Sequence, residues 1–202
     1  MPLKIGFDLD NTIINYDRAF HELACENGWI QHNVPVDKVQ VQQHIRQLAD
    51  GQNLWEQAQA MVYGPRIQRS TLNEGVTACL HELHECGHQL CIISHKTQVS
   101  PHDPLRTDLR ASAIRQLAHL GVLEIIHSRD VYFESTRALK VQRIRAERCQ
   151  VFIDDLRETF LEPEFPAACV KLLFAPGRQY MPKDEDVLPC TSFADVLHAI
   201  AD

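Results

Sequence analysis

Two aspartates, Asp8 and Asp10, stand two positions apart in the stretch FDLDNT, directly after a short apolar run. Side chains two apart on an extended strand point to the same face, so these two carboxylates would repel each other. A second acidic pair, Asp154 and Asp155, follows the apolar run QVFI. A bound cation stabilises carboxylates gathered in this way, because like charges raise one another's pKa. Oxygen ligands favour a hard ion, and the sequence therefore predicts a Mg²⁺ site.

A hydroxyl group and an ammonium group occur at comparable places in the chain. Ser94 ends the apolar run LCIIS, and Lys140 lies in the helical pattern TRALKVQRIRAERC, shortly before the second acidic pair. In open α/β sheets, ligands bind beyond the carboxyl ends of the strands, where these side chains would meet. The ordered set therefore predicts one polar site, assembled from four separate parts of the chain.

The segments between these residues alternate between strand and helix patterns. One buried strand opens the chain, and three consecutive stretches with helical spacing follow it. Helices and buried strands then alternate, which requires right-handed parallel crossovers, and the short apolar runs LEIIH and VYF are further strand candidates. The sequence predicts an α/β fold with a doubly wound, Rossmann-like parallel sheet at 1–15 and 73–202. A small all-helical domain is expected at 16–72.

Composition narrows the class of protein. The chain has 202 residues, of which 45% are hydrophobic and 23% are charged, as in soluble globular proteins. A formal charge of −7 argues against a nucleic-acid polymer as partner, because such binding neutralises phosphates with a basic surface. No apolar run approaches the ~20 residues of a membrane span, and the first residues lack a secretory signal pattern. We expect a cytoplasmic protein with reduced cysteines, of unknown oligomeric state.

The chain resembles the haloacid dehalogenase-like (HAD) hydrolase superfamily in the order of four motifs: Asp8-x-Asp10-x-Thr12, Ser94, Lys140 and Asp154-Asp155. The resemblance covers most of the chain. It includes the helical insert directly after the first motif, where many members carry a mobile cap over the active site. Each motif alone is weak, but the ordered set after strands and helices of the right type is specific.

The resemblance implies a phosphatase that hydrolyses a small phosphorylated metabolite, a sugar phosphate or a nucleotide monophosphate, through an aspartyl-phosphate intermediate. Asp8 would be the nucleophile, and Asp10 would protonate the leaving oxygen and later activate water. Ser94 would donate to a phosphoryl oxygen, and Lys140 would offset the charge of Asp8 and the phosphate. Phosphate ester chemistry is favoured over dehalogenation, because a departing halide needs no acid at the position of Asp10.

Further residues are expected around this core. The metal ligands would be Asp8, the backbone carbonyl of Asp10, Asp155 and, less directly, Asp154, with Glu158 as a looser candidate. Substrate contacts are expected from the backbone of Asn11 and Thr12, from His95 beside Ser94 and from Tyr63 and Arg66, with Arg178 as a weaker candidate. Lys96, in SHKT, is an alternative to Lys140, which stands closer to Asp155 than in many members.

Other interpretations stay open. The same scaffold supports phosphomutases and phosphotransferases, and receiver-type signalling domains also join acids, a hydroxyl and a lysine without catalysing turnover. A receiver places its acidic pair first and its lysine last, which differs from the order in this chain. The stretch HELHECGH has a spacing that could bind zinc, although the solvent face of an amphipathic helix is a simpler explanation.

Overall fold

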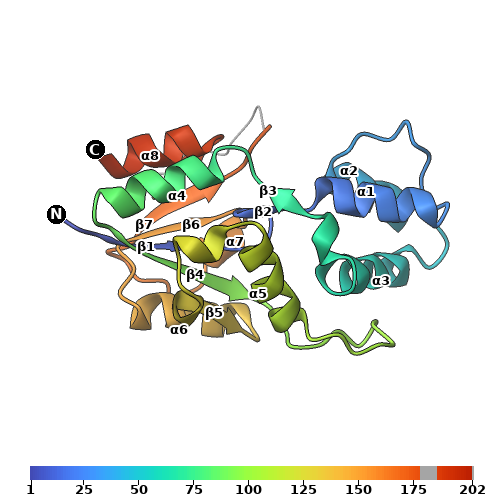
Figure 1. Cartoon of the computed structure of the whole chain (residues 1–202). Coiled ribbons are helices and arrows are strands. Elements are labelled where there is room, and N and C mark those ends of the chain that lie inside the picture. Colours follow the sequence, from blue (N-terminus) through green and yellow to red (C-terminus); the bar gives the residue numbers. More distant parts are fainter. Residues whose placement is uncertain (178–185, 202) are drawn as a thin grey trace. The chain divides into compact units, whose positions relative to one another are not determined.

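A computed structural model of the chain describes residues 1–177 and 186–201 (Figure 1). Arg178 therefore lies outside the described residues. Two compact units are present, and each is built from separate segments of the chain. The first, which we call the α/β unit, comprises Met1–Ile14, Leu72–Lys96 and Gly121–Asp202. The second, which we call the helical unit, comprises Asn15–Thr71 and Thr97–Leu120.

The α/β unit is built on a six-stranded sheet with the strand order β5-β4-β1-β6-β7-β8. All of its strand pairs are parallel. The strands are β1 (Lys4–Phe7), β4 (Gln89–His95), β5 (Val131–Glu134), β6 (Val151–Asp154), β7 (Val170–Phe174) and β8 (Val187–Cys190). The central strands are buried, as expected when helices cover a parallel sheet on both faces. The predicted α/β class, with a doubly wound, Rossmann-like sheet, is therefore confirmed.

Helices cover both faces of this sheet. α4 (Val76–Glu85) and α8 (Phe193–Ala201) lie side by side on one face, and α6 (Arg137–Ala146) covers the other (Figure 1). The face of α6 that carries Val141 and Ile144 packs on the sheet in a fully buried cluster. Each such side chain contributes about 1.5–3 kcal/mol when it leaves water. This packing fixes α6, and with it Lys140, beside the ends of the strands.

The helical unit has its own aromatic core. Its helices are α1 (Asp17–Glu26), α2 (Lys38–Arg46), α3 (Gly51–Tyr63) and α5 (Leu109–His119), with the short 3₁₀ helix η1 (Ile67–Arg69). Phe20 stacks on Trp55 with ring centroids 4.7 Å apart, and Tyr63 meets Tyr16 edge to face at 4.9 Å. Such pairs contribute about 0.5–1.5 kcal/mol beyond their buried area, so this unit holds its own packed centre.

The helical unit differs from the expected insert at 16–72 by including a second segment. Thr97–Leu120 belongs to it, although the sequence pattern placed that segment in the α/β core. Within this unit α5 packs against α3 and η1. A helical pattern shows which side of a helix is buried but not which neighbour buries it, so the sequence could not assign α5. A two-stranded sheet of β2 (Ile14–Asn15) and β3 (Thr71–Leu72) lies where the chain passes between units.

Two short apolar runs behave differently from each other. The run VYF forms β5, as predicted, but LEIIH is not a strand. Its first residues belong to the 3₁₀ helix η2 (Val122–Glu124), and Ile126 is buried beyond it. Apolar runs this short do not separate strand from helix by periodicity. The prediction for LEIIH was therefore wrong.

Candidate active site

Parallel pairing brings the acidic ends of β1 and β6 to the same edge of the sheet. Phe7 pairs with Ile153, and the backbone N–H of Asp8 donates to the Ile153 carbonyl at 2.8 Å. Asp8 and Asp154 therefore follow at adjacent positions. Carboxylate oxygens of Asp8, Asp154 and Asp155 lie within 4.8 Å of one another. The structure thus brings together the two acidic stretches that the sequence places far apart.

Lys140 lies between two of these carboxylates. Its Nζ is 2.5 Å from Oδ1 of Asp8 and 2.6 Å from Oδ2 of Asp154, and its side chain is only 3% exposed. The hydroxyl of Thr136 caps α6 by accepting from the Leu139 N–H at 3.1 Å, which starts the helix one turn before Lys140. Lys140 therefore lies within hydrogen-bond distance of both acidic stretches.

Burial and charge act in opposite directions on these groups. Burial is the largest cause that raises the pKa of Asp8, and Asp154 and Asp155 add to it, while Lys140 opposes the shift. For Lys140, burial acts to lower the pKa, but the carboxylates of Asp154 and Asp8 together raise it above its ordinary value. The ammonium group is therefore charged at neutral pH, and ionisation of Asp8 is costly in this cluster.

The two adjacent aspartates of the second pair are held differently. Oδ1 of Asp154 accepts from the Leu156 N–H at 2.9 Å, and its Oδ2 accepts from Lys140, so both oxygens are engaged and the residue is fully buried. Asp155 is half-buried and accepts from the side-chain amide of Asn11 at 3.2 Å. Asp155 is therefore the more accessible carboxylate of the pair.

A second lysine binds the remaining carboxylate. Nζ of Lys96 is 2.8 Å from Oδ2 of Asp10, and the Lys96 side chain is 3% exposed. Each of the two lysines therefore contacts a different acid of the first motif. Carboxylate oxygens of Asp8, Asp154 and Asp155 lie close enough together to share one ion, and oxygen donors suit Mg²⁺, so the residues present fit that ion.

The loop after Asp8 is held in an unusual conformation. Asn11 has φ 67°, in the left-handed region that asparagine tolerates better than most residues. The side-chain amide of Asn73 donates to the carbonyls of Asn11, at 2.9 Å, and Thr12, at 2.7 Å. Asn73 could not be predicted from the sequence, because a single asparagine in TLNEG carries no spacing or periodic signal. Its contacts show that it fixes the shape of this loop.

Two buried hydroxyl groups add to the site. The side-chain oxygens of Thr12 and Ser94 have no hydrogen-bond partner among the described residues. Thr12 is fully buried and Ser94 is 1% exposed. A buried unsatisfied polar group costs about 1–3 kcal/mol, so an oxygen-rich ligand that reached these hydroxyls would recover that cost.

The other predicted substrate contacts have partners of their own. His95 is exposed, a ring nitrogen lies 3.2 Å from the Ser135 carbonyl, and partial burial lowers its pKa. Arg66 belongs to the helical unit, where its guanidinium forms an ion pair with Glu26.

Two looser metal interpretations gain no support among the described residues. Glu158 is exposed and does not belong to the group of carboxylates that could share an ion. The stretch HELHECGH forms no group of potential metal ligands in the part of the chain that the structure describes. His81 and His84 are exposed on α4, and His88 accepts a hydrogen bond from the Leu3 N–H at 3.0 Å.

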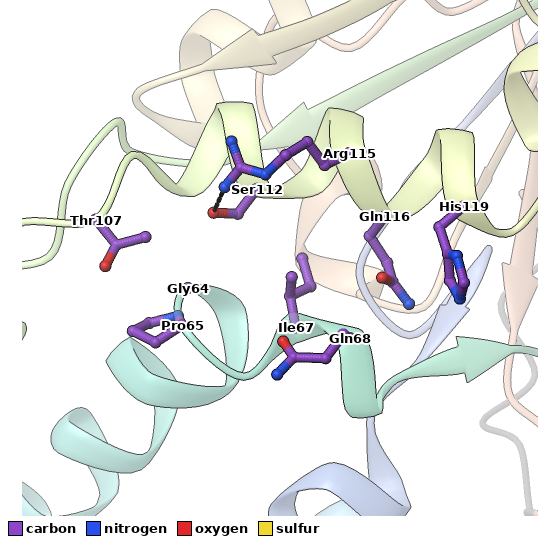
Figure 2. A pocket seen from close by; sticks show the side chains of 9 residues that line it. All are labelled: Gly64, Pro65, Ile67, Gln68, Thr107, Ser112, Arg115, Gln116 and His119. Carbon is purple, nitrogen blue, oxygen red and sulfur yellow. Dashed lines mark hydrogen bonds between the residues drawn. The ribbon is translucent and has the colours of Figure 1, made fainter.

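A separate cavity of about 380 Å³ lies within the helical unit. Figure 2 shows Arg115, Gln116 and His119 of α5 on one side of it and Ile67 and Gln68 of η1 on the other. Its lining contains no carboxylate and no residue that the sequence analysis singled out. It is therefore a feature distinct from the acidic cluster. Among the described residues, no helix has the length and hydrophobicity needed to cross a membrane.

Comparison with known proteins identifies the fold. The sequence matches no protein-family model and no curated protein. A HAD-superfamily hydrolase from Ehrlichia chaffeensis is similar in structure, with a TM-score of 0.58, 15% identity, and coverage of 100% of this chain and 98% of that one. A HAD family hydrolase from Deinococcus radiodurans has a TM-score of 0.57 at 16% identity, covering 99% and 95%. HAD-hydrolase YfnB from Bacillus subtilis has a TM-score of 0.55 at 12% identity, covering 100% and 99%. The chain therefore has the fold of HAD-superfamily hydrolases.

Proposed function

We propose that the protein is a Mg²⁺-dependent phosphatase of the HAD superfamily that hydrolyses a small phosphomonoester in the cytoplasm. One observation carries the proposal: a buried lysine joins Asp8 to Asp154, with a further carboxylate within 4.8 Å, and the Ser94 hydroxyl on the neighbouring strand has no hydrogen-bond partner among the described residues. Among proteins with this fold, the Deinococcus radiodurans hydrolase is described with bound phosphate and sodium and YfnB with magnesium. Both descriptions agree with a site for a cation and an oxyanion.

The residues of the proposed site are either metal ligands or residues that hold those ligands in place. Asp8 and Asp155, with the backbone carbonyl of Asp10, would hold Mg²⁺, while Asp154 would act less directly because Lys140 and the Leu156 N–H engage its oxygens. Bound Mg²⁺ would lower the charge repulsion between the phosphate and the carboxylates. Asn11 donates to Asp155 and would keep that ligand oriented.

The chain's own residues can perform the reaction in two steps. In the first step an oxygen of Asp8 attacks phosphorus, the bond from phosphorus to the alcohol oxygen breaks, and Asp10 gives that oxygen a proton. In the second step a water molecule attacks the phosphorus of the aspartyl phosphate and transfers a proton to Asp10, which frees phosphate and restores Asp8. Ser94 and the N–H groups of Asn11 and Thr12 would donate to the phosphoryl oxygens.

We further propose that the helical unit acts as a cap that selects the substrate. The chain enters it directly after the first motif, and again directly after Lys96. Each entry point lies within a few residues of proposed site residues, which favours a unit that responds to the ligand. Limited proteolysis near Asn15 and Thr71 should slow when Mg²⁺ and a phosphate mimic are present, and equal cleavage rates would argue against a closing cap.

The direct test is hydrolysis of an aryl phosphate, followed by a screen of small phosphorylated metabolites with Mg²⁺. We expect turnover by the wild type and a loss of more than about 10³-fold in Asp8→Asn, since the nucleophile is removed. Asp130→Asn, at an exposed ion pair with Arg129, is the matched control and should keep its activity. Activity with no phosphomonoester, or equal activity in wild type and Asp8→Asn, would contradict the proposal.

A further inference from the structure

Lys96 is a buried cation that the chemistry described above does not use. It follows β4 by one residue, and its backbone N–H donates to the Glu134 carbonyl at 2.8 Å, which extends the pairing of β4 with β5. The whole residue is 4% exposed. A lysine that loses its water shell in this way needs a strong anionic partner, because desolvating an ammonium ion costs several kcal/mol.

That partner is the carboxylate of Asp10, at 2.8 Å from Oδ2. The backbone of Asp10 is held as well, through a bridge to Ile14 and through the Asn11 N–H, which donates to the Ile14 carbonyl at 2.8 Å. The Asp10 side chain is 18% exposed, against 7% for Asp8, so it is the more open of the two carboxylates. The contact with Lys96 therefore restrains the Asp10 side chain.

We propose that Lys96 is a positioning residue that selects which oxygen of Asp10 transfers the proton. An ammonium group has three donors and no acceptor, so the oxygen facing it, Oδ2, accepts a hydrogen bond and does not itself carry a proton. The proton that Asp10 gives to the leaving oxygen, and later takes from water, then resides on Oδ1. Lys96 and Lys140 thus have separate tasks, one at the acid and one at the nucleophile.

This inference rests on the proposed function, and its test separates it from a purely structural role of Lys96. A proton donor matters most when the leaving group is a strong base, and little when the leaving oxygen departs as a stable anion. If Lys96 orients Asp10, its loss should weaken hydrolysis of phenyl phosphate far more than hydrolysis of 2,4-dinitrophenyl phosphate. If Lys96 only supports the fold, its loss should weaken both equally.

The experiment compares Lys96→Met, Lys96→Arg and the wild type on these two aryl phosphates with Mg²⁺. We expect Lys96→Met to lose about 10- to 100-fold in kcat on phenyl phosphate but less than about threefold on the dinitrophenyl ester, with KM little changed. Lys96→Arg should recover part of the loss, because it keeps the cation. Lys171→Met, at a half-buried lysine of β7, is the control and should match the wild type on both substrates.

The possible outcomes distinguish a failure of the proposed role of Lys96 from a failure of the proposed phosphatase function. Equal losses on both esters, or no loss on either, would overturn the role of Lys96 while leaving the phosphatase assignment intact. If the wild type hydrolyses no phosphomonoester, the proposed function fails, and crystal structures of wild type and Lys96→Met then decide the role of Lys96. A rotated Asp10 carboxylate beside unmoved Asp8 and Asp154 is expected in the variant, and an unmoved Asp10 would overturn the inference.

Discussion

Lys140 and Asp8 are 132 residues apart in the sequence, yet the lysine Nζ lies 2.5 Å from a carboxylate oxygen of Asp8. The same nitrogen lies 2.6 Å from Asp154, so a single ammonium group links the first strand, α6 and β6. A buried ion pair of this kind is weak evidence for stability, since desolvation offsets much of the attraction. Its importance lies in placing Asp8, the proposed nucleophile, and its counter-charge at a defined point.

Lys140→Met should destabilise the protein and reduce its activity. Removing one partner leaves Asp8 and Asp154 as uncompensated buried charges, which costs about 3–5 kcal/mol. Urea unfolding should show this loss, and hydrolysis of aryl phosphates should fall by more than about 10²-fold. Lys171→Met is the matched control. A variant that unfolds at the wild-type urea concentration would contradict the role of Lys140 as the counter-charge of both aspartates.

Asp8→Asn should make the Mg²⁺-free protein more stable at neutral pH. The pKa of Asp8 is raised in the folded state, chiefly by burial. Its contribution to stability is therefore fully present below the pKa of Asp8 in the unfolded chain, which is about 4. As pH rises above that value, the unfolded chain releases the proton first, and the folded state loses stability relative to Asp8→Asn.

Thermal melts in a chelator between pH 4 and pH 8 would check this prediction. The wild-type melting temperature should fall relative to that of Asp8→Asn as pH rises. Added Mg²⁺ should raise the melting temperature of the wild type more than that of the variant. Parallel curves for the two proteins across this range would show that Asp8 carries no such cost.

Ser94→Ala should separate stability from activity. Its hydroxyl is buried without a partner among the described residues, so its removal should raise the free energy of unfolding by about 1 kcal/mol. Turnover should fall by about 10²-fold, because the proposed donor to the phosphoryl oxygens is lost. Ser112→Ala removes a hydroxyl that donates to the Asp108 carbonyl at 2.8 Å. In that variant we expect a lower free energy of unfolding and unchanged turnover. Lower stability in Ser94→Ala would indicate that its hydroxyl has an internal partner.

Asn73→Ala should loosen the loop between Asp8 and Thr12. Two carbonyls would lose their buried donor, at a cost of about 1–3 kcal/mol each, and the left-handed Asn11 would no longer be held in place. We expect a lower urea midpoint together with a kcat reduced by about tenfold. Asn53→Ala, which removes an exposed contact with Asp50, serves as the control. Unchanged kcat in Asn73→Ala would show that the loop keeps its shape without this clamp.

The sequence predicted that the acidic residues lie together, because one rule applies to residues at the ends of parallel strands. Polar residues after buried parallel strands meet at the carboxyl edge of the sheet, and this rule alone predicts that Asp8 and Asp154 lie near one another. The rule says nothing about pairing within the cluster. Whether Lys96 replaced Lys140 or accompanied it was open, and only the distances show that each contacts a different aspartate.

Other features of the fold and the site could not be predicted from the sequence, and each has a physical reason. β8 was missed because VLPC contains Pro189, which breaks the strand pattern but is tolerated at the edge of a sheet, where the missing N–H needs no partner. The helical pattern of α5 did not show that it packs within the helical unit, since packing partners are set by tertiary contacts. Asn73 acts through two backbone carbonyls, and such a contact leaves no trace in the spacing of residues.

Gly6 shows how tightly the chemistry depends on the packing beneath it. A methyl group at this position would lie 2.6 Å from the Phe152 ring, and Nζ of Lys140 stands 5.4 Å from the centroid of that same ring. Even alanine would therefore force the ring beside Lys140 to shift, which should disturb the distances from the lysine to both carboxylates. A random mutagenesis screen for lost turnover would recover Gly6 alongside the acidic residues, even though glycine offers no group that could touch a substrate.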